Sequence, residues 1–197
     1  MHRSIGLKAG SIFALFIGVL VLAAAAVFIN NTRINGEENT LTEAIEGGES
    51  ILTAIGRIHE SLTNFVKDEE DLAEEMLKAA QASQEYAKAK LTSAQHTRDD
   101  FVLNMAENYG VLLNSSHVMT QGVDNLLVIS DDLKKTLSYY RDGAYEEAAE
   151  RAADCLQILT PSVDQFELEN QSLDSINYHY IASGHRDRVK HAVDQYR

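Results

Sequence analysis

The chain of 197 residues carries 17 lysines and arginines against 30 aspartates and glutamates, a formal net charge of −13 at pH 7. Binding to a phosphate backbone needs a basic surface, so this charge excludes nucleic acid from the expected partners. A single proline and many alanines and glutamates indicate helix nearly throughout, and we predict an all-α protein.

The first predicted element is an apolar segment over residues 10–30. The twenty residues from Gly10 to Ile29 contain no charged side chain. At about 1.5 Å per helical residue, this length matches a hydrocarbon layer of about 30 Å. A secretory signal usually has a shorter apolar core, of about 7 to 15 residues, so the length favours an uncleaved membrane anchor. Four successive alanines, residues 23–26, leave cleavage as the alternative.

The charges on either side of this segment predict its orientation. Arg3 and Lys8 precede it, whereas Arg33 follows it among several glutamates. Positively charged flanks stay on the cytoplasmic side of a membrane. We therefore predict four parts in chain order: a cytoplasmic tail over 1–9, a lipid-embedded anchor over 10–30, a linker over 31–39 and an extracytoplasmic body over 40–197.

Residues 40–96 carry apolar side chains that recur every seven residues, a pattern typical of helical bundles and coiled coils. One line of this pattern consists of Ala44, Ile51, Ile58, Phe65, Leu72, Ala79 and Tyr86. The sequence from Thr40 to Glu43 resembles a capping box for a helix start. Because the acidic cluster at residues 68–71 contains neither glycine nor proline, we predict one long helix over 40–96. A fold-back at this cluster is the alternative.

A second line of heptads runs from Met105 to Tyr140, offset by four residues from the first. The offset predicts a turn near residues 97–100 with Thr97 as a cap, and a stutter in an unbroken helix is the alternative. Gly143 would end this helix, and a third helix would run towards residue 196 with a break or kink at Pro161. The predicted body is an elongated bundle of three long antiparallel helices, or of four if the first folds back.

Sequence motifs of catalysis and metal binding are missing from the chain. No histidine follows a glutamate by three residues, no second cysteine accompanies Cys155, and no nucleophile elbow or glycine-rich phosphate loop occurs. We therefore predict a protein that is not an enzyme, with no catalytic residue, metal or cofactor.

Three residues are candidates for an interaction or a pH-sensitive role: His59, Tyr140 and Tyr180. His59 falls on the predicted buried stripe, where a titratable ring could sense pH or fix the register of the helices. The alternative is a histidine at the edge of the bundle, with its ring partly exposed to solvent and no special role. Tyrosine is enriched late in the chain, and such amphipathic rings suit a partner surface or a ligand groove as well as plain helix packing.

The opening MHRSIGLKAG, the apolar segment and a helical body of this size resemble the sensory half of bacterial and archaeal chemoreceptors and sensor kinases. The resemblance implies a helical-bundle ectodomain that senses a ligand. Such receptors continue with a second span, a linker and a cytoplasmic signalling rod, which this sequence lacks. It carries over no ligand-binding residue, because no motif is shared.

Together these features predict a single-pass, membrane-anchored, extracytoplasmic helical bundle without enzymatic activity. It would act as a scaffold or complex subunit by contacting another protein or a second copy through its helical stripes. A ligand-sensing ectodomain of the chemoreceptor type is one alternative, and it requires an even number of helices in the body if the chain is to return to the membrane. A pilin-like filament subunit with the apolar segment as its assembly core is another.

Overall fold

The computed structural model describes residues 36–196, and these residues form helices and connecting turns without a strand. The all-α prediction is confirmed. The predicted tail and anchor, residues 1–30, lie outside the described residues. Within residues 36–196, no helix has both the length and the apolar character that crossing a membrane requires.

The chain divides into two compact units, Met1–Asn39 and Thr40–Arg197. Residues 36–39 are the described part of the first unit, and they are helical. The box from Thr40 to Glu43 therefore does not begin a helix, which corrects the predicted start. In the second unit, helix continues to residue 66, and we name this element the 40–66 helix.

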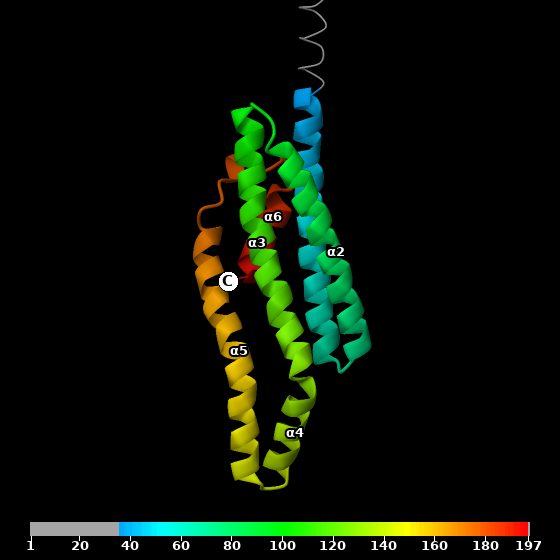
Figure 1. Cartoon of the computed structure of the whole chain (residues 1–197), viewed down its shortest axis with the longest axis vertical. Coiled ribbons are helices and arrows are strands. Elements are labelled where there is room, and N and C mark those ends of the chain that lie inside the picture. The colour runs from blue at the N-terminus through cyan, green and yellow to red at the C-terminus, as the bar shows by residue number, and fades with distance from the viewer. Residues whose placement is uncertain (1–35, 197) are drawn as a thin grey trace, which may run out of the picture. The chain divides into compact units, whose positions relative to one another are not determined.

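The second unit consists of long helices that alternate in direction along the chain (Figure 1). After the 40–66 helix, drawn in blue to cyan, the elements are α2 (Glu70–Ala94), α3 (Asp100–Val128), α4 (Ser130–Arg141), α5 (Tyr145–Leu173), the short η1 (Tyr178–Tyr180) and α6 (Arg186–Tyr196). α4 extends the course of α3 after a break at Ile129, and α5 returns beside both. The long segments thus form four passes.

The predicted single helix over 40–96 is wrong, because the chain folds back at residues 67–69. Asp68 has a φ of 66°, a left-handed conformation that aspartate tolerates better than most residues. The Lys134 ammonium of α4 braces the turn through contacts of 2.6 Å to the Asp68 carboxylate and 2.7 Å to Glu70. The fold-back that the sequence left as the alternative is what the structure shows.

Folding back lets the stripes of the 40–66 helix and α2 bury each other. The residues of α2 that are buried follow a regular spacing of three and four: Ala73, Leu77, Ala80, Gln84, Ala87, Leu91 and Ala94. Two polar contacts fix the register. The Ser61 hydroxyl donates to the carbonyl of Ala73 at 2.6 Å, and the Arg57 guanidinium donates to the carbonyl of Ala79 at 2.7 Å.

The later turns follow the sequence closely. α2 ends at Ala94 and α3 begins at Asp100, which confirms the predicted turn. The N-cap of α3 is Asp99, whose carboxylate accepts a hydrogen bond from the Phe101 N–H at 2.8 Å. The predicted cap, Thr97, instead accepts from the Asp99 N–H within the turn. Gly143, with a φ of 79°, follows the end of α4 as expected. Pro161 lies inside α5 without ending it.

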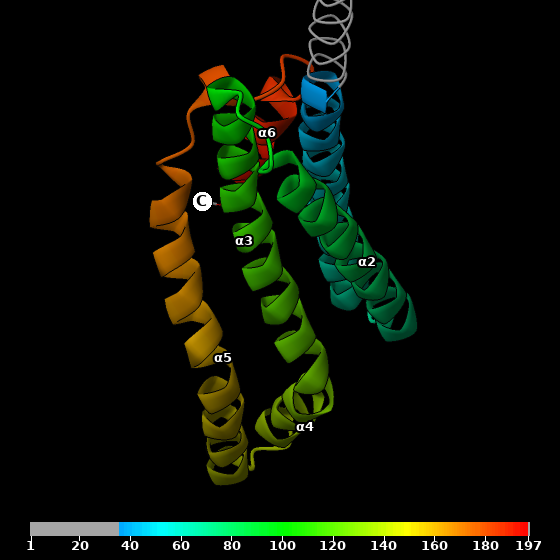
Figure 2. The same cartoon turned by 45° about the horizontal axis from the view of Figure 1, so that its top comes forward.

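The third predicted helix, which should have reached residue 196, ends at Leu173. Residues 174–185 cross the end of the bundle, and α6 then runs back beside α3 and the 40–66 helix (Figures 1 and 2). The buried residues of α6 are Val189, Ala192 and Val193, and they belong to the main hydrophobic core. The segment bends because these three residues are buried within the bundle rather than along an extension of α5.

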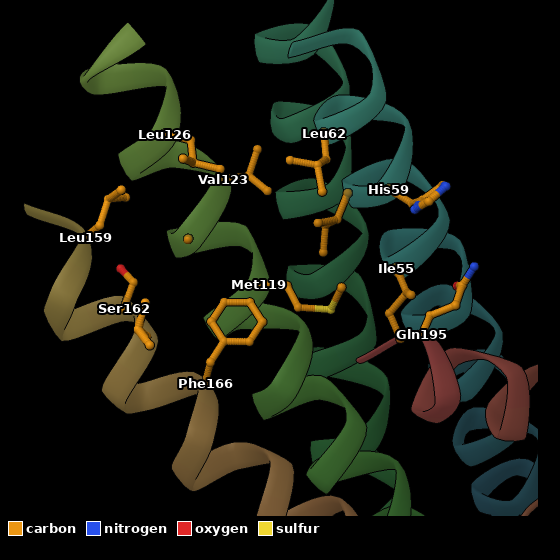
Figure 3. A pocket seen from close by; sticks show the side chains of 13 residues that line it. Ile55, His59, Leu62, Met119, Val123, Leu126, Leu159, Ser162, Phe166 and Gln195 are labelled. Atoms are coloured by element: carbon orange, nitrogen blue, oxygen red, sulfur yellow. The ribbon is translucent and has the colours of Figure 1, made fainter. Parts of the chain in front are cut away.

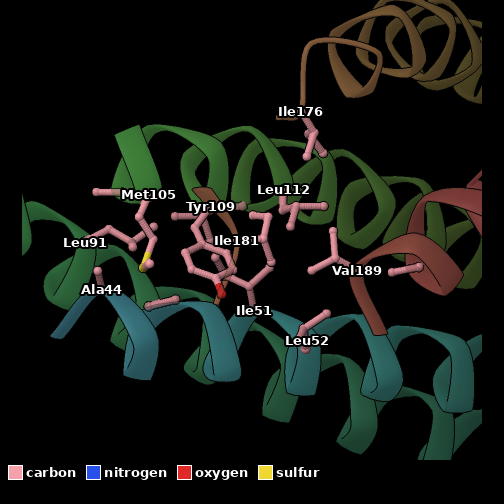
Figure 4. Close-up of a cluster of buried hydrophobic side chains, with 14 of the residues drawn as sticks. Ala44, Ile51, Leu52, Leu91, Met105, Tyr109, Leu112, Ile176, Ile181 and Val189 are labelled. Atoms are coloured by element: carbon pink, nitrogen blue, oxygen red, sulfur yellow. The ribbon is translucent and has the colours of Figure 1, made fainter. Parts of the chain in front are cut away.

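Tyr109 of α3 lies at the centre of this core, fully buried against the 40–66 helix (Figure 4). Its ring packs directly on the backbone of Gly48: a Cβ placed there would lie 2.3 Å from the ring carbon Cζ. Gly47 is similarly tight against Leu91 of α2, at 2.9 Å. The two adjacent glycines therefore allow α2 and α3 to approach the same turn of the 40–66 helix.

We expect the Gly48→Ala substitution to destabilise the protein by at least the roughly 1–3 kcal/mol that overpacking a core costs, because Tyr109 must move. Gly56→Ala in the same helix is the matched control, since a Cβ there meets nothing within 4 Å. That change should stabilise by about 0.5–1 kcal/mol through helix propensity. Denaturant unfolding of the full chain measures both, and equal effects would contradict this packing.

Candidate functional site

A polar cluster in which two members are buried and two are exposed connects α6 with α3 and the 40–66 helix. It consists of Glu49, Tyr109, His185 and Arg188, which we call the Tyr109 cluster. The Tyr109 Oη lies 2.6 Å from the His185 Nδ1, and the His185 Nε2 lies 3.1 Å from the Glu49 carboxylate. Arg188 of α6 donates to the same carboxylate at 2.6 Å. Since a carboxylate only accepts, Nε2 carries the imidazole proton, and Nδ1 accepts from the Tyr109 hydroxyl.

Burial sets the protonation states in this cluster. It lowers the pKa of His185, although the nearby Glu49 opposes that shift, so the ring is neutral near pH 7. Burial also raises the pKa of Tyr109 to about 12. The hydrogen bond from Arg188 lowers the pKa of the Glu49 carboxyl. In the cluster, each donor is thus paired with an acceptor, and these hydrogen bonds position α6.

Next to α6, an apolar groove of about 360 Å³ opens between the 40–66 helix, α3 and α5 (Figure 3). The residues that line it are Ile55, Ile58, His59, Leu62, Met119, Gly122, Val123, Leu126, Leu159, Ser162, Val163, Phe166 and Gln195. Most of these side chains are apolar. The groove therefore suits an apolar guest, with a few polar groups at its edges.

The groove exists because α6 is short. With the eleven residues of Arg186–Tyr196, it fills one part of the space between the 40–66 helix and α5, and Gln195 in its last turn borders the groove. Beyond that turn no described segment separates the two helices. Gly122 on α3 lets the Phe166 ring of α5 pack closely: a Cβ there would lie 2.9 Å from that ring. Figure 3 shows Phe166 projecting from α5 towards α3.

The three candidate residues from the sequence lie in different places. His59 is exposed at the edge of the groove, not buried in a helix seam. Tyr140, at the end of α4, is exposed and packs edge-on against the Tyr145 ring. Tyr180 lies in η1 against Phe101. The structure brings none of them together, and His59 alone lines the groove.

Sequence reasoning missed the Tyr109 cluster. Its members are separated by as many as 139 residues, and each alone is an ordinary bundle residue. A usable signal was Gly48 within the 40–66 helix, because a glycine inside a helix can mark the close approach of a large ring. Among residues 36–196, no three histidine, cysteine, aspartate or glutamate side chains are grouped to hold a metal ion.

The shifted pKa of His185 makes stability depend on pH. Because this pKa is below its ordinary 6.5 in the folded protein, the unfolded chain binds the proton more readily. The free energy of unfolding should therefore fall as the pH drops below 6.5, with the His185 contribution intact above it. His185→Gln keeps a donor and an acceptor and should lose part of that slope, whereas His191→Gln, at an exposed position of α6, should not. Urea unfolding between about pH 5 and pH 8 measures this. An unchanged slope in His185→Gln would contradict it.

Comparison with known proteins gives no relative to guide the interpretation of these features. No family model, no curated protein and no solved structure matches the chain. The groove and the Tyr109 cluster are therefore interpreted from their own geometry and chemistry. By that measure, the groove is the feature of the described residues best suited to binding.

Proposed function

We propose that the protein is a single-pass membrane protein whose extracytoplasmic helical bundle holds an apolar partner in the groove, without catalysis. The groove is the observation that carries this proposal. Its volume of about 360 Å³ lies within the range of natural binding clefts, about 300–1,000 Å³. The uncharged residues from Gly10 to Ile29 and the basic tail before them support the membrane tether.

The exposure of the groove supports binding over simple core packing. Leu62 of the 40–66 helix and Val163 of α5 both line the groove and are 38 % and 55 % exposed. Single exposed apolar residues are common and need no explanation. Here, however, they lie in a concave site with Met119 and Phe166, where a guest would remove several apolar surfaces from water at once.

A ligand-sensing ectodomain is the second candidate, and the number of long helical passes favours it. The turn at Asp68 gives the described body four long passes, so α5 ends at the same end of the bundle as the start of the 40–66 helix, before the short α6 runs back. In that case the guest would be a small apolar molecule, and the groove could accommodate one. Both candidates use the same site and the same tether.

The tether is tested on the full chain by alkaline extraction of membranes. We expect the full chain to stay in the membrane pellet and a variant without residues 10–30 to be extracted, because those residues supply the apolar length for insertion. Protease added from outside should digest the body of the intact protein. A mature protein that begins near Val27 and is released into the medium would refute the tether.

The groove is tested by site-specific photocrosslinking in the native membrane. A benzophenone side chain at Val163 should yield a discrete adduct, because this position faces the groove. The same group at Leu168 is the matched control: it lies on the same helix and is 65 % exposed, but it does not line the groove. Equal adducts at both positions, or none at Val163, would contradict the proposed function.

A further inference from the structure

We infer that the guest of the groove is an amphipathic α-helix with basic flanks, supplied by a partner protein, which packs in line with α6. The inference rests on the proposed function and specifies the partner. It comes from three features of the described residues: the character of α6, the continuity of its packing site with the groove, and the charge of the surrounding helices.

α6 shows what kind of element this part of the bundle accommodates. Its apolar face consists of Val189, Ala192 and Val193, at a spacing of three and four, and all are buried. Its exposed positions are rich in basic side chains: Arg186, Arg188, Lys190 and His191. One of these, Arg188, pairs with Glu49 of the 40–66 helix. The element seated here is thus a short basic amphipathic helix.

The packing site of α6 and the groove are continuous. Ile55 and Met119 line the groove, and the same two residues border a small cavity together with Ala192 and Val193 of α6. Gln195 in the last turn of α6 lines the groove, and Figure 3 shows it beside Ile55. A second helix in the groove would therefore contact the same faces of the 40–66 helix and α3 that already contact α6.

The spacing of the groove residues suits a helix. On α5, Leu159, Val163 and Phe166 repeat at four and three residues and form a straight ridge on one side. The ridge continues beyond the groove to Leu156, which is 62 % exposed. On the opposite side, Val66 continues the line of Leu62 and is 77 % exposed. Each apolar edge thus extends over about three turns, enough for a helix of about ten residues.

The charge around the groove favours a basic guest. α3 contains no lysine or arginine, and neither do residues 152–173 of α5. Exposed acidic residues flank the groove residues along the chain: Glu60 follows His59, and Asp164 follows Val163. Acidic flanks complement donor-rich lysine and arginine side chains.

The test uses the full chain in phosphatidylcholine nanodiscs and two labelled synthetic peptides of about 12 residues. Both carry leucine and valine at i, i+3, i+4 and i+7, and they differ only in having lysine or glutamate at the remaining positions. Fluorescence anisotropy, with empty nanodiscs as the blank, should show saturable binding of the lysine peptide. The glutamate peptide should bind at least about tenfold more weakly, and added salt should reduce this difference.

Two variants locate the binding site. Val163→Gln should weaken binding of the lysine peptide by about tenfold or more, whereas Leu168→Gln should leave it unchanged, since both are exposed residues of α5 and only Val163 lines the groove. Circular dichroism of both variants should match that of the parent chain. This pair separates loss of the site from loss of the fold.

Other outcomes overturn the inference in distinguishable ways. Equal affinity for the two peptides would refute a basic guest. Binding of anilinonaphthalene sulfonate that Val163→Gln abolishes, with neither peptide bound, would identify a small-molecule groove and leave the proposed function standing. A dimer of the full chain that Val163→Gln dissociates would make a second copy the guest. If photocrosslinking at Val163 also fails, the proposed function fails with it.

Discussion

The contact between Tyr109 and Gly48 is the constraint on which the rest of the bundle depends. The buried phenol ring of Tyr109 packs on the backbone of Gly48, where a side chain would leave it no room, and this contact sets the spacing of α3 and the 40–66 helix. The hydroxyl of that ring then points at His185 and accepts from the Ala182 N–H at 3.3 Å. Through these two contacts the position of α3 determines where the chain turns after α5 and where α6 begins.

The course of α6 in turn creates the groove. α6 packs at one end of the space between the 40–66 helix and α5, where Ala192 and Val193 lie near Ile55 and Leu173. The two helices cannot close behind its last turn without losing the packing of Val189 and Val193 in the core. The groove is therefore a consequence of the fold: α6 occupies one end of the space between the helices, and the other end stays open.

The sequence predicted the helical content, the turn after Ala94 and the glycine after α4, because these follow from local propensity and periodicity. It left the turn at Asp68 as an alternative to one long helix, because the deciding factor is the packing of α2 back onto the 40–66 helix, with Leu77 and Leu91 in the buried clusters. The heptad line continues through the turn, and periodicity alone therefore cannot reveal it. His59 was predicted on a buried stripe, but it is exposed and lines the groove, a position that depends on how α3 and α5 pack beside the 40–66 helix. Glu49, Tyr109 and His185 form a site only once three helices are in place.

Pro161 gives one wall of the groove an interrupted backbone. Since proline has no N–H, the carbonyl of Gln157 cannot receive the usual helical hydrogen bond, and a proline in a helix interior costs about 3 kcal/mol. This turn lies immediately before Ser162 and Val163 in the wall. α5 consequently bends most easily beside the opening, whereas the opposite wall is stiffened by the close pairing of the 40–66 helix with α2. α5 is therefore the more flexible wall of the groove, and it would bend to accommodate bulky side chains of a guest.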